Sequence, residues 1–156
     1  MACKERLISY LKDNGVHYTL DDHRTAYTAH ELAKVEHVPG RQVAKVVMII
    51  AKRSPVMVVM PATKRLSMTQ IRLATNDLDA RLAEEAEFAG AFPDCEVGAM
   101  PAFGQLYGVS VYVDESLLED DKITFPAGSH REALTVTCSD FIRLTKPNVG
   151  AYATAA

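Results

Sequence analysis

The sequence has only three cysteines and no long apolar run, and each of these two features excludes a class of protein. Its longest apolar stretches, residues 46–51 and 56–62, are far shorter than the ~20 residues that span a bilayer. Cys3, Cys95 and Cys138 are an odd number without a Cys-x-x-Cys pair. We therefore expect reduced thiols and a cytoplasmic protein rather than a disulfide-stapled one. The charged start, Met-Ala-Cys-Lys-Glu-Arg, lacks the apolar segment of a secretory signal.

The motifs of several common enzyme classes are also missing. The chain has no Gly-x-Ser-x-Gly elbow, no P-loop and no Gly-x-Gly-x-x-Gly, so a serine hydrolase, a nucleoside triphosphatase and a Rossmann dehydrogenase lack support. His17, His23, His30 and His37 are spaced six or seven residues apart, without the pattern of a metal site. Cys95 is flanked by two acidic residues and is a poor candidate nucleophile. We expect neither a metal nor a cofactor.

Basic residues are unevenly distributed along the chain. The 17 basic and 20 acidic residues give a net charge of −3. From Arg41 to Arg72 there are seven basic residues and no acidic one, which leaves 10 basic against 20 acidic residues elsewhere. Such a block can bind one polyanion at one place while the acidic remainder repels it. The solvated ends of strands and a helix would give the same pattern.

Composition and hydrophobic spacing predict one globular domain. The chain is 48% apolar and 24% charged, which is typical of a domain with its own core. Spacing and capping signals predict helices over residues 3–14, 28–38, 67–75, 84–91 and 139–144. Runs of β-branched residues predict strands over residues 16–20, 43–51, 56–60, 109–113, 123–125 and 133–137. We expect a single α+β domain over residues 1–147, with a curled, mixed, mainly antiparallel sheet flanked by helices, and a flexible tail over 148–156.

Three features are candidates for chemistry. Lys45 lies in a strand whose faces are otherwise apolar, so its ammonium must reach water, pair with a carboxylate or bind an anion. The segment from Glu96 to Gly104 is rich in glycine, and its backbone N–H groups can point into a cleft and stabilise an oxyanion. A structural turn is the alternative for this loop. His130 ends a turn between two predicted strands, where a surface histidine is the alternative.

In their order and spacing, these features resemble the YbaK and prolyl-tRNA-synthetase-associated domain family, whose members hydrolyse mischarged aminoacyl-tRNAs. The strand lysine of the family matches Lys45 in Gly40-Arg-Gln-Val-Ala-Lys-Val-Val. Its loop G-x-x-x-P-F-G matches Gly98-Ala-Met-Pro-Ala-Phe-Gly104 in length, and its A-G-x-H element matches Ala127-Gly-Ser-His130. The similarity covers nearly the whole chain.

The resemblance implies an aminoacyl-tRNA deacylase that removes a small amino acid, with proline tRNA as the candidate carrier. It implies three catalytic residues and no protein nucleophile, metal or cofactor. Lys45 would anchor the phosphate or ribose of the acceptor end, backbone N–H groups from Gly98 onward would hold the carbonyl oxygen, and His130 would contact the aminoacyl end or the water. The expected substrate-binding residues are Tyr18, Ala99, Met100, Pro101, Phe103, Gly104 and Gly128.

A tRNA substrate gives the basic block a use, because its side chains can follow the acceptor stem. The expected tRNA-binding residues are Arg41, Lys52, Arg53, Lys64, Arg65 and Arg72. The expected partners are aminoacyl-tRNA and, as a candidate protein partner, prolyl-tRNA synthetase. Neither a membrane nor DNA is expected.

Two alternatives remain at this point. The chain departs from the family pattern at Ala102, where proline is usual, and at Val46, where a polar residue is frequent. These departures favour a noncatalytic module that binds tRNA or a synthetase. The same lysine and glycine loop would also suit a hydrolase or binding protein for a smaller anionic acyl ligand.

Overall fold

The computed structural model describes residues 2–155, and this part of the chain contains five α-helices and ten short strands joined by 3-10 turns. The helices are α1 (Cys3–Asp13), α2 (Ala29–Glu36), α3 (Met68–Thr75), α4 (Glu85–Phe88) and α5 (Cys138–Thr145). All five lie where the sequence predicts helices. The predicted helix over residues 84–91 is divided in the structure, because α4 is followed by a separate 3-10 turn over Ala89–Ala91.

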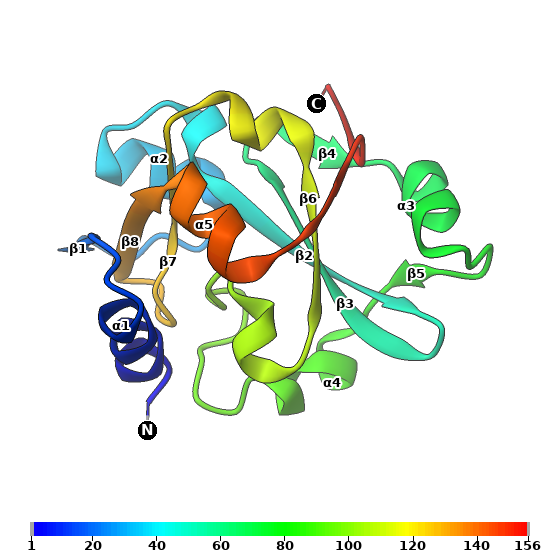
Figure 1. Cartoon of the computed structure of the whole chain (residues 1–156), viewed down its shortest axis with the longest axis horizontal. Helices are drawn as coiled ribbons and strands as arrows, with labels where there is room; N and C mark the ends of the chain where they lie inside the picture. The colour runs from blue at the N-terminus through cyan, green and yellow to red at the C-terminus, as the bar shows by residue number, and fades with distance from the viewer. Residues whose placement is uncertain (1, 156) are drawn as a thin grey trace.

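The largest sheet has five strands in the order β5-β2-β3-β6-β9. These strands are β5 (Arg81–Leu82), β2 (Ala44–Ala51), β3 (Ser54–Pro61), β6 (Ser110–Asp114) and β9 (Asn148–Gly150). The predicted hairpin is confirmed, since β2 and β3 pair antiparallel with Lys45 opposite Met60. Strand β6 runs parallel to both β3 and β9. In Figure 1 the turn of the β2–β3 hairpin points toward the side of α3 and β5, away from α1 and α2.

A second sheet has three antiparallel strands in the order β1-β8-β7. Its strands are β1 (Thr19–Asp22), β8 (Glu132–Thr137) and β7 (Lys122–Pro126). A bridge between Val43 and Thr124 joins this sheet to the beginning of β2. The arrangement confirms the predicted α+β class with a mixed, mainly antiparallel sheet. The predicted strand over residues 16–20 is shifted, because β1 begins only at Thr19.

The C-terminal segment is paired with the rest of the fold. Strand β9 lies beside β6, and β10 (Ala153–Ala155) pairs with β4 (Lys64–Leu66). Between them Tyr152 is buried, and the backbone N–H groups of Tyr152 and Ala153 donate to Asp114 Oδ1 at 2.8 and 2.9 Å. The prediction of a flexible tail is therefore wrong for residues 148–155. These residues pair with β6 and β4, which lie far away in the sequence, so local sequence did not indicate the pairing. Residue 156 lies outside the described part.

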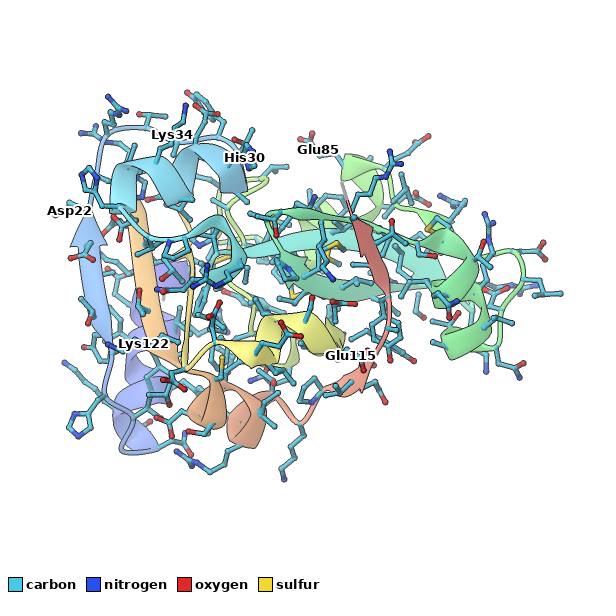
Figure 2. The ribbon with its side chains drawn as sticks, turned by 90° about the horizontal axis from the view of Figure 1, so that it is seen from above. Asp22, His30, Lys34, Glu85, Glu115 and Lys122 are labelled. Atoms are coloured by element: carbon cyan, nitrogen blue, oxygen red, sulfur yellow. A yellow bond between two sulfur atoms is a disulfide. The ribbon has the colours of Figure 1, made fainter. Side chains whose placement is uncertain are left out.

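The start of α2 is fixed by a local cap. Thr28 Oγ1 accepts a hydrogen bond from the Glu31 N–H at 3.1 Å, as its Thr-x-x-Glu spacing predicts. Ser67 caps α3 in the same way through the Gln70 N–H at 3.3 Å. The cap of α5 is Thr137, two residues before the predicted start. In Figure 2 His30 and Lys34 lie on the outer side of α2, turned away from the sheets.

Cys3 and Cys95 form a disulfide with Cα atoms 5.2 Å apart, so the expectation of three reduced thiols is wrong for this pair. The bond ties the first turn of α1 to the segment that precedes Gly98. Cys138 is free and buried, and burial raises the pKa of its thiol to about 11. The thiol of Cys138 is therefore protonated at neutral pH.

Reduction of the disulfide is expected to lower the free energy of unfolding by about 2–5 kcal/mol, because the bond closes a long loop of the unfolded chain. Urea unfolding with and without a dithiol reductant measures this difference. A Cys3→Ser/Cys95→Ser double variant serves as the control, since its stability should not respond to the reductant. Equal stability of the wild-type protein in both conditions would contradict the assignment of the bond.

Candidate active site

A cavity of about 320 Å³ opens between the N-terminal end of α2, the first half of β2 and two loops, residues 97–100 and 126–132. Its apolar walls come mainly from the two regular elements and include Ala26, Ala29, Leu32, Ala44, Val46 and Met100. Its polar groups include His23, Thr28, Lys45, Ser129, His130 and Glu132. Small or apolar walls with a few convergent polar groups are typical of a binding site for a small ligand group.

Lys45 contributes an unpaired cation to this cavity. It lies in β2 between Ala44 and Val46, and all three residues line the cavity. Its Nζ donates to the backbone oxygen of Lys64 at 2.6 Å. Across residues 2–155 no carboxylate lies within ion-pair distance of Lys45, and burial lowers the pKa of its ammonium. The ammonium retains N–H donors for an anion in the cavity.

The two loops that border the cavity are joined to each other by backbone hydrogen bonds. The Glu96 N–H donates to Gly128 O at 2.9 Å, and the Gly128 N–H donates to Ala99 O at 3.0 Å. The Glu96 side chain accepts from the His130 N–H at 3.2 Å. These bonds hold Gly98 and His130 on one side of the cavity.

Gly98 has a backbone conformation that favours glycine, with φ of +85°. Its N–H donates to Met100 Sδ at 3.3 Å. A thioether sulfur is a weak acceptor, so this donor can exchange it for a charged oxygen at low cost. Gly98 also lies against His130, because a Cβ built on Gly98 would be 3.4 Å from His130 Cε1.

His130 is oriented by two neighbours. Its Nε2 lies 2.9 Å from the Val97 carbonyl oxygen, which can only accept a hydrogen bond. In the neutral ring the proton is therefore on Nε2, and Nδ1 is left as an acceptor. The ring of Tyr27 lies against the imidazole with 4.9 Å between centroids. The cavity thus combines a cation, a weakly engaged N–H donor and an imidazole acceptor.

The sequence profile of the aminoacyl-tRNA editing domain matches residues 23–144 of the chain. The chain belongs to the aminoacyl-tRNA editing domain family. The matched span contains Lys45, Gly98 and His130, the residues of the three motifs. The family expected from those motifs is thereby confirmed.

Known proteins resemble this editing domain along nearly its whole length. The multifunctional Ser/Thr-tRNA deacylase ProXp-y of Escherichia coli K12 is 23% identical over 150 residues, which cover 93% of this chain and 89% of that protein. Among solved structures, a candidate trans-editing enzyme for prolyl tRNA synthetase has a TM-score of 0.86 at 18% identity and covers 99% of each chain. A candidate signal transduction protein from Marinobacter aquaeolei VT8 has a TM-score of 0.74 at 16% identity, with 96% of this chain matching 30% of that one. The structures share the fold.

The cavity of this editing domain contains only some of the residues expected to bind substrate. Met100 lines the cavity, whereas Ala99 and Pro101 are buried behind it. Phe103 is fully buried in the core, with ring centroids 5.5 Å from Phe125 and 5.6 Å from another phenylalanine on α5. Tyr18 is half-buried against the same core, outside the cavity lining.

Two of the expected glycines have packing roles. A Cβ on Gly104 would lie 3.1 Å from Val109 O, where the chain turns back on itself. A Cβ on Gly128 would lie 2.7 Å from Cys3 Sγ, and Gly128 has φ of +98°. Gly128 is therefore required where the disulfide meets the loop of His130.

Of the two departures from the family pattern, Ala102 is fully buried in the core, whereas Val46 lines the cavity.

The basic block does not form one surface. Lys64 and Arg65 lie in β4, and the Lys64 carbonyl accepts a hydrogen bond from Lys45. Arg41 pairs with Asp120 at 3.2 Å. Arg72 on α3 donates to a backbone carbonyl at 2.9 Å.

Lys52 and Arg53 lie at the other end of the hairpin. They form the β2–β3 turn with φ of 51° and 66°. They border a second hollow, which also contains Asp77, Asp79 and the ion pair of Arg81 with Glu87. These acidic neighbours reduce the attraction of this end for a polyanion.

Several cavity residues were not identified from the sequence. Tyr27, Leu32, Ser129 and Glu132 all line the cavity. The one available signal was the cap at Thr28, which places the residues around it at the beginning of a helix.

Within residues 2–155, no three His, Cys, Asp or Glu side chains are grouped so as to hold a metal ion. No helix in the described part is long and apolar enough to span a membrane.

Proposed function

We propose that this editing domain hydrolyses the ester bond of a small amino acid mischarged onto tRNA, with proline tRNA as the preferred carrier. Water adds to the ester carbonyl carbon, the bond from that carbon to the ribose oxygen breaks, and a proton from the water passes to the leaving ribose oxygen. The products are the free amino acid and tRNA with a terminal hydroxyl. The family to which the chain belongs supports this reaction class.

The observation that carries the proposal is the Lys45 ammonium, half-buried in a cavity without a carboxylate partner. Burying a cation costs free energy unless an anion compensates it. A phosphate of the tRNA acceptor end provides that anion. Binding of the phosphate offsets the cost of burying Lys45 and fixes the adjacent ester in the cavity.

The remaining groups act on the ester. The Gly98 N–H leaves Met100 Sδ and donates to the carbonyl oxygen as that oxygen becomes negative. His130 Nδ1 accepts a hydrogen bond from the attacking water, which orients it. No cavity residue acts as a covalent nucleophile.

A small amino acid fits the walls of the cavity. Ala26, Leu32 and Met100 limit its size, while Thr28 and Ser129 offer hydroxyl groups to a polar side chain. One methylene group changes binding by only ~1–3 kcal/mol, so a synthetase that charges near-isosteric amino acids needs a second selection step. The E. coli relative is named for seryl and threonyl tRNA, and the solved structure for prolyl tRNA synthetase. The first of these names supports serine and threonine as amino acids to test, and alanine and cysteine are tested beside them because they are also small.

A deacylation panel tests the proposed function. Purified protein is mixed with proline tRNA carrying each small amino acid, and release of the free amino acid is compared with spontaneous hydrolysis. We expect accelerated release of at least one small amino acid and no acceleration for correctly charged prolyl-tRNA. Binding of tRNA with no acceleration for any aminoacyl group would instead support the noncatalytic module.

The tRNA contacts are expected to come from the end of the basic block that lies beside Lys45. Arg65→Ala should weaken tRNA binding and reduce the slope of log K against log salt concentration by about 1, as expected for one lost phosphate contact. Arg53→Ala serves as the matched control, because its side chain lies at the far end of the hairpin among acidic residues. Binding titrations at several salt concentrations measure both slopes. An equal loss in the two variants would contradict this placement of the acceptor stem.

A further inference from the structure

The rim of the cavity carries an exposed aromatic ring that the roles described above do not use. Tyr27 lies between β1 and α2, and 69% of it is exposed to solvent. It lines the cavity together with Lys45 and Gly98, although it belongs to none of the hydrophobic core clusters. The fold therefore gains little packing from this ring.

The backbone around Tyr27 is nevertheless firmly held. The Ala26 N–H donates to His130 O at 2.9 Å, and the His23 N–H donates to Arg131 O at 2.8 Å. On the other side Thr28 caps α2. The Tyr27 ring lies against His130, with an angle of 55° between the planes. The ring is thus presented at a fixed place on the rim, with most of its surface free.

We propose that Tyr27 is the stacking surface for the adenine base of the terminal adenosine of tRNA. This proposal rests on the proposed function, in which Lys45 holds a phosphate and Gly98 the ester carbonyl. Both groups are attached to the same nucleotide as the base, so a base that does not enter the cavity must lie on its rim. His130 contacts both Gly98 and Tyr27, which places the ring next to the position of the ribose ester.

Stacking on an aromatic ring suits this base. Stacking needs no hydrogen-bond partner on the protein, and it orders the nucleotide without a deep pocket. The exposed ring of Tyr27 offers such a surface beside His130.

The first test compares Tyr27→Ala with Tyr27→Phe, using the aminoacyl-tRNA that the wild-type protein hydrolyses fastest. We expect Tyr27→Ala to raise KM by about 5- to 150-fold, the range for loss of one stacked base, with little change in kcat. Tyr27→Phe should retain the wild-type KM, because it keeps the ring. An unchanged KM for Tyr27→Ala, or an equal defect in Tyr27→Phe, would overturn the proposal. Melting temperatures of both variants should match the wild type, since the side chain is mostly exposed.

The second test needs no hydrolysis and so separates this proposal from the proposed function. The chain has no tryptophan, so Tyr27→Trp places a single indole on the rim. A minihelix with the acceptor stem and a terminal adenosine should quench its fluorescence, whereas the same minihelix with an abasic last position should not. Leu78→Trp is the control, because Leu78 is 77% exposed just after α3, on the opposite side of the molecule from α2 (Figure 1). Equal quenching of Tyr27→Trp by both minihelices would refute base stacking.

Discussion

Replacing Lys45 with methionine is expected to reduce ester hydrolysis about 30-fold or more while the protein stays folded. Removing one partner of a desolvated charge pair costs ~2–5 kcal/mol, and on our account the tRNA phosphate is that partner. Methionine keeps most of the side-chain volume and removes the charge. Single-turnover release of the amino acid, measured with a substrate that the wild-type protein hydrolyses, gives the size of the loss.

The same substitution is expected to leave the free energy of unfolding at pH 7 within about 1 kcal/mol of the wild type. The variant loses the hydrogen bond to Lys64 O, which contributes ~1 kcal/mol, but it also loses the cost of burying an ammonium. Lys34→Met is the control, because Lys34 is exposed on the outer side of α2 (Figure 2) and should keep full activity. Retained hydrolysis in Lys45→Met would show that the cation is not needed, and unfolding would show that it is structural.

The lowered pKa of Lys45 also gives the direction of a pH effect. Burial disfavours the charged form in the folded state, so protonated Lys45 lowers the free energy of unfolding at neutral pH. This cost disappears as the pH rises from the lowered pKa to the ordinary value of 10.5. Activity changes in the opposite direction, because deprotonation removes the cation that binds phosphate. The kcat/KM of the wild-type protein should therefore fall on the alkaline side before an ordinary lysine would titrate.

Gly98→Ala is the second substitution with a large expected effect. An alanine at φ of +85° is strained, and its Cβ would approach His130. The N–H group would be displaced from the position where the carbonyl oxygen becomes negative. Loss of one such donor lowers kcat by ~10²–10³ in well-studied enzymes. Single-turnover rates at saturating enzyme concentration measure this effect without a contribution from weaker binding.

Gly15→Ala separates backbone strain from the loss of the donor. Gly15 has φ of +67° and no atom within 4 Å of a built Cβ, and it follows α1 outside the cavity. Both alanine variants should lose about 1–2 kcal/mol of stability from the left-handed conformation. Only Gly98→Ala should slow hydrolysis. A similar slowing in Gly15→Ala would mean that reduced stability, not the oxyanion donor, explains the loss.

The parts of the fold that depend on local chemistry could be predicted from the sequence. Thr28 and Ser67 begin helices because each hydroxyl satisfies an N–H three residues later. The β2–β3 hairpin follows from two apolar runs around a short polar turn. The unusual position of Lys45 was also visible, since a single cation in an apolar strand requires an explanation.

The features that depend on distant contacts could not be predicted in this way. Cys3 and Cys95 are separated by 92 residues, and nothing in their local sequence indicates that they meet. The need for glycine at position 128 follows from this pairing, because Cys3 occupies the place of its side chain. Tyr27 lies beside His130 because backbone hydrogen bonds join its segment to the loop before β8, as from the Ala26 N–H to His130 O. The burial of Phe103 within a motif that resembles a substrate loop is likewise a property of the packed core.

In the proposed function the Lys45 ammonium binds the negatively charged end of the substrate. The most direct test of this contact is an NMR titration of the Lys45 side chain, with the protein alone and with a minihelix that carries a nonhydrolysable amide-linked alanine. The free protein should show a pKa below the ordinary lysine value, and bound phosphate should raise it. A Lys45 pKa that is identical with and without the minihelix under saturating conditions would contradict the account.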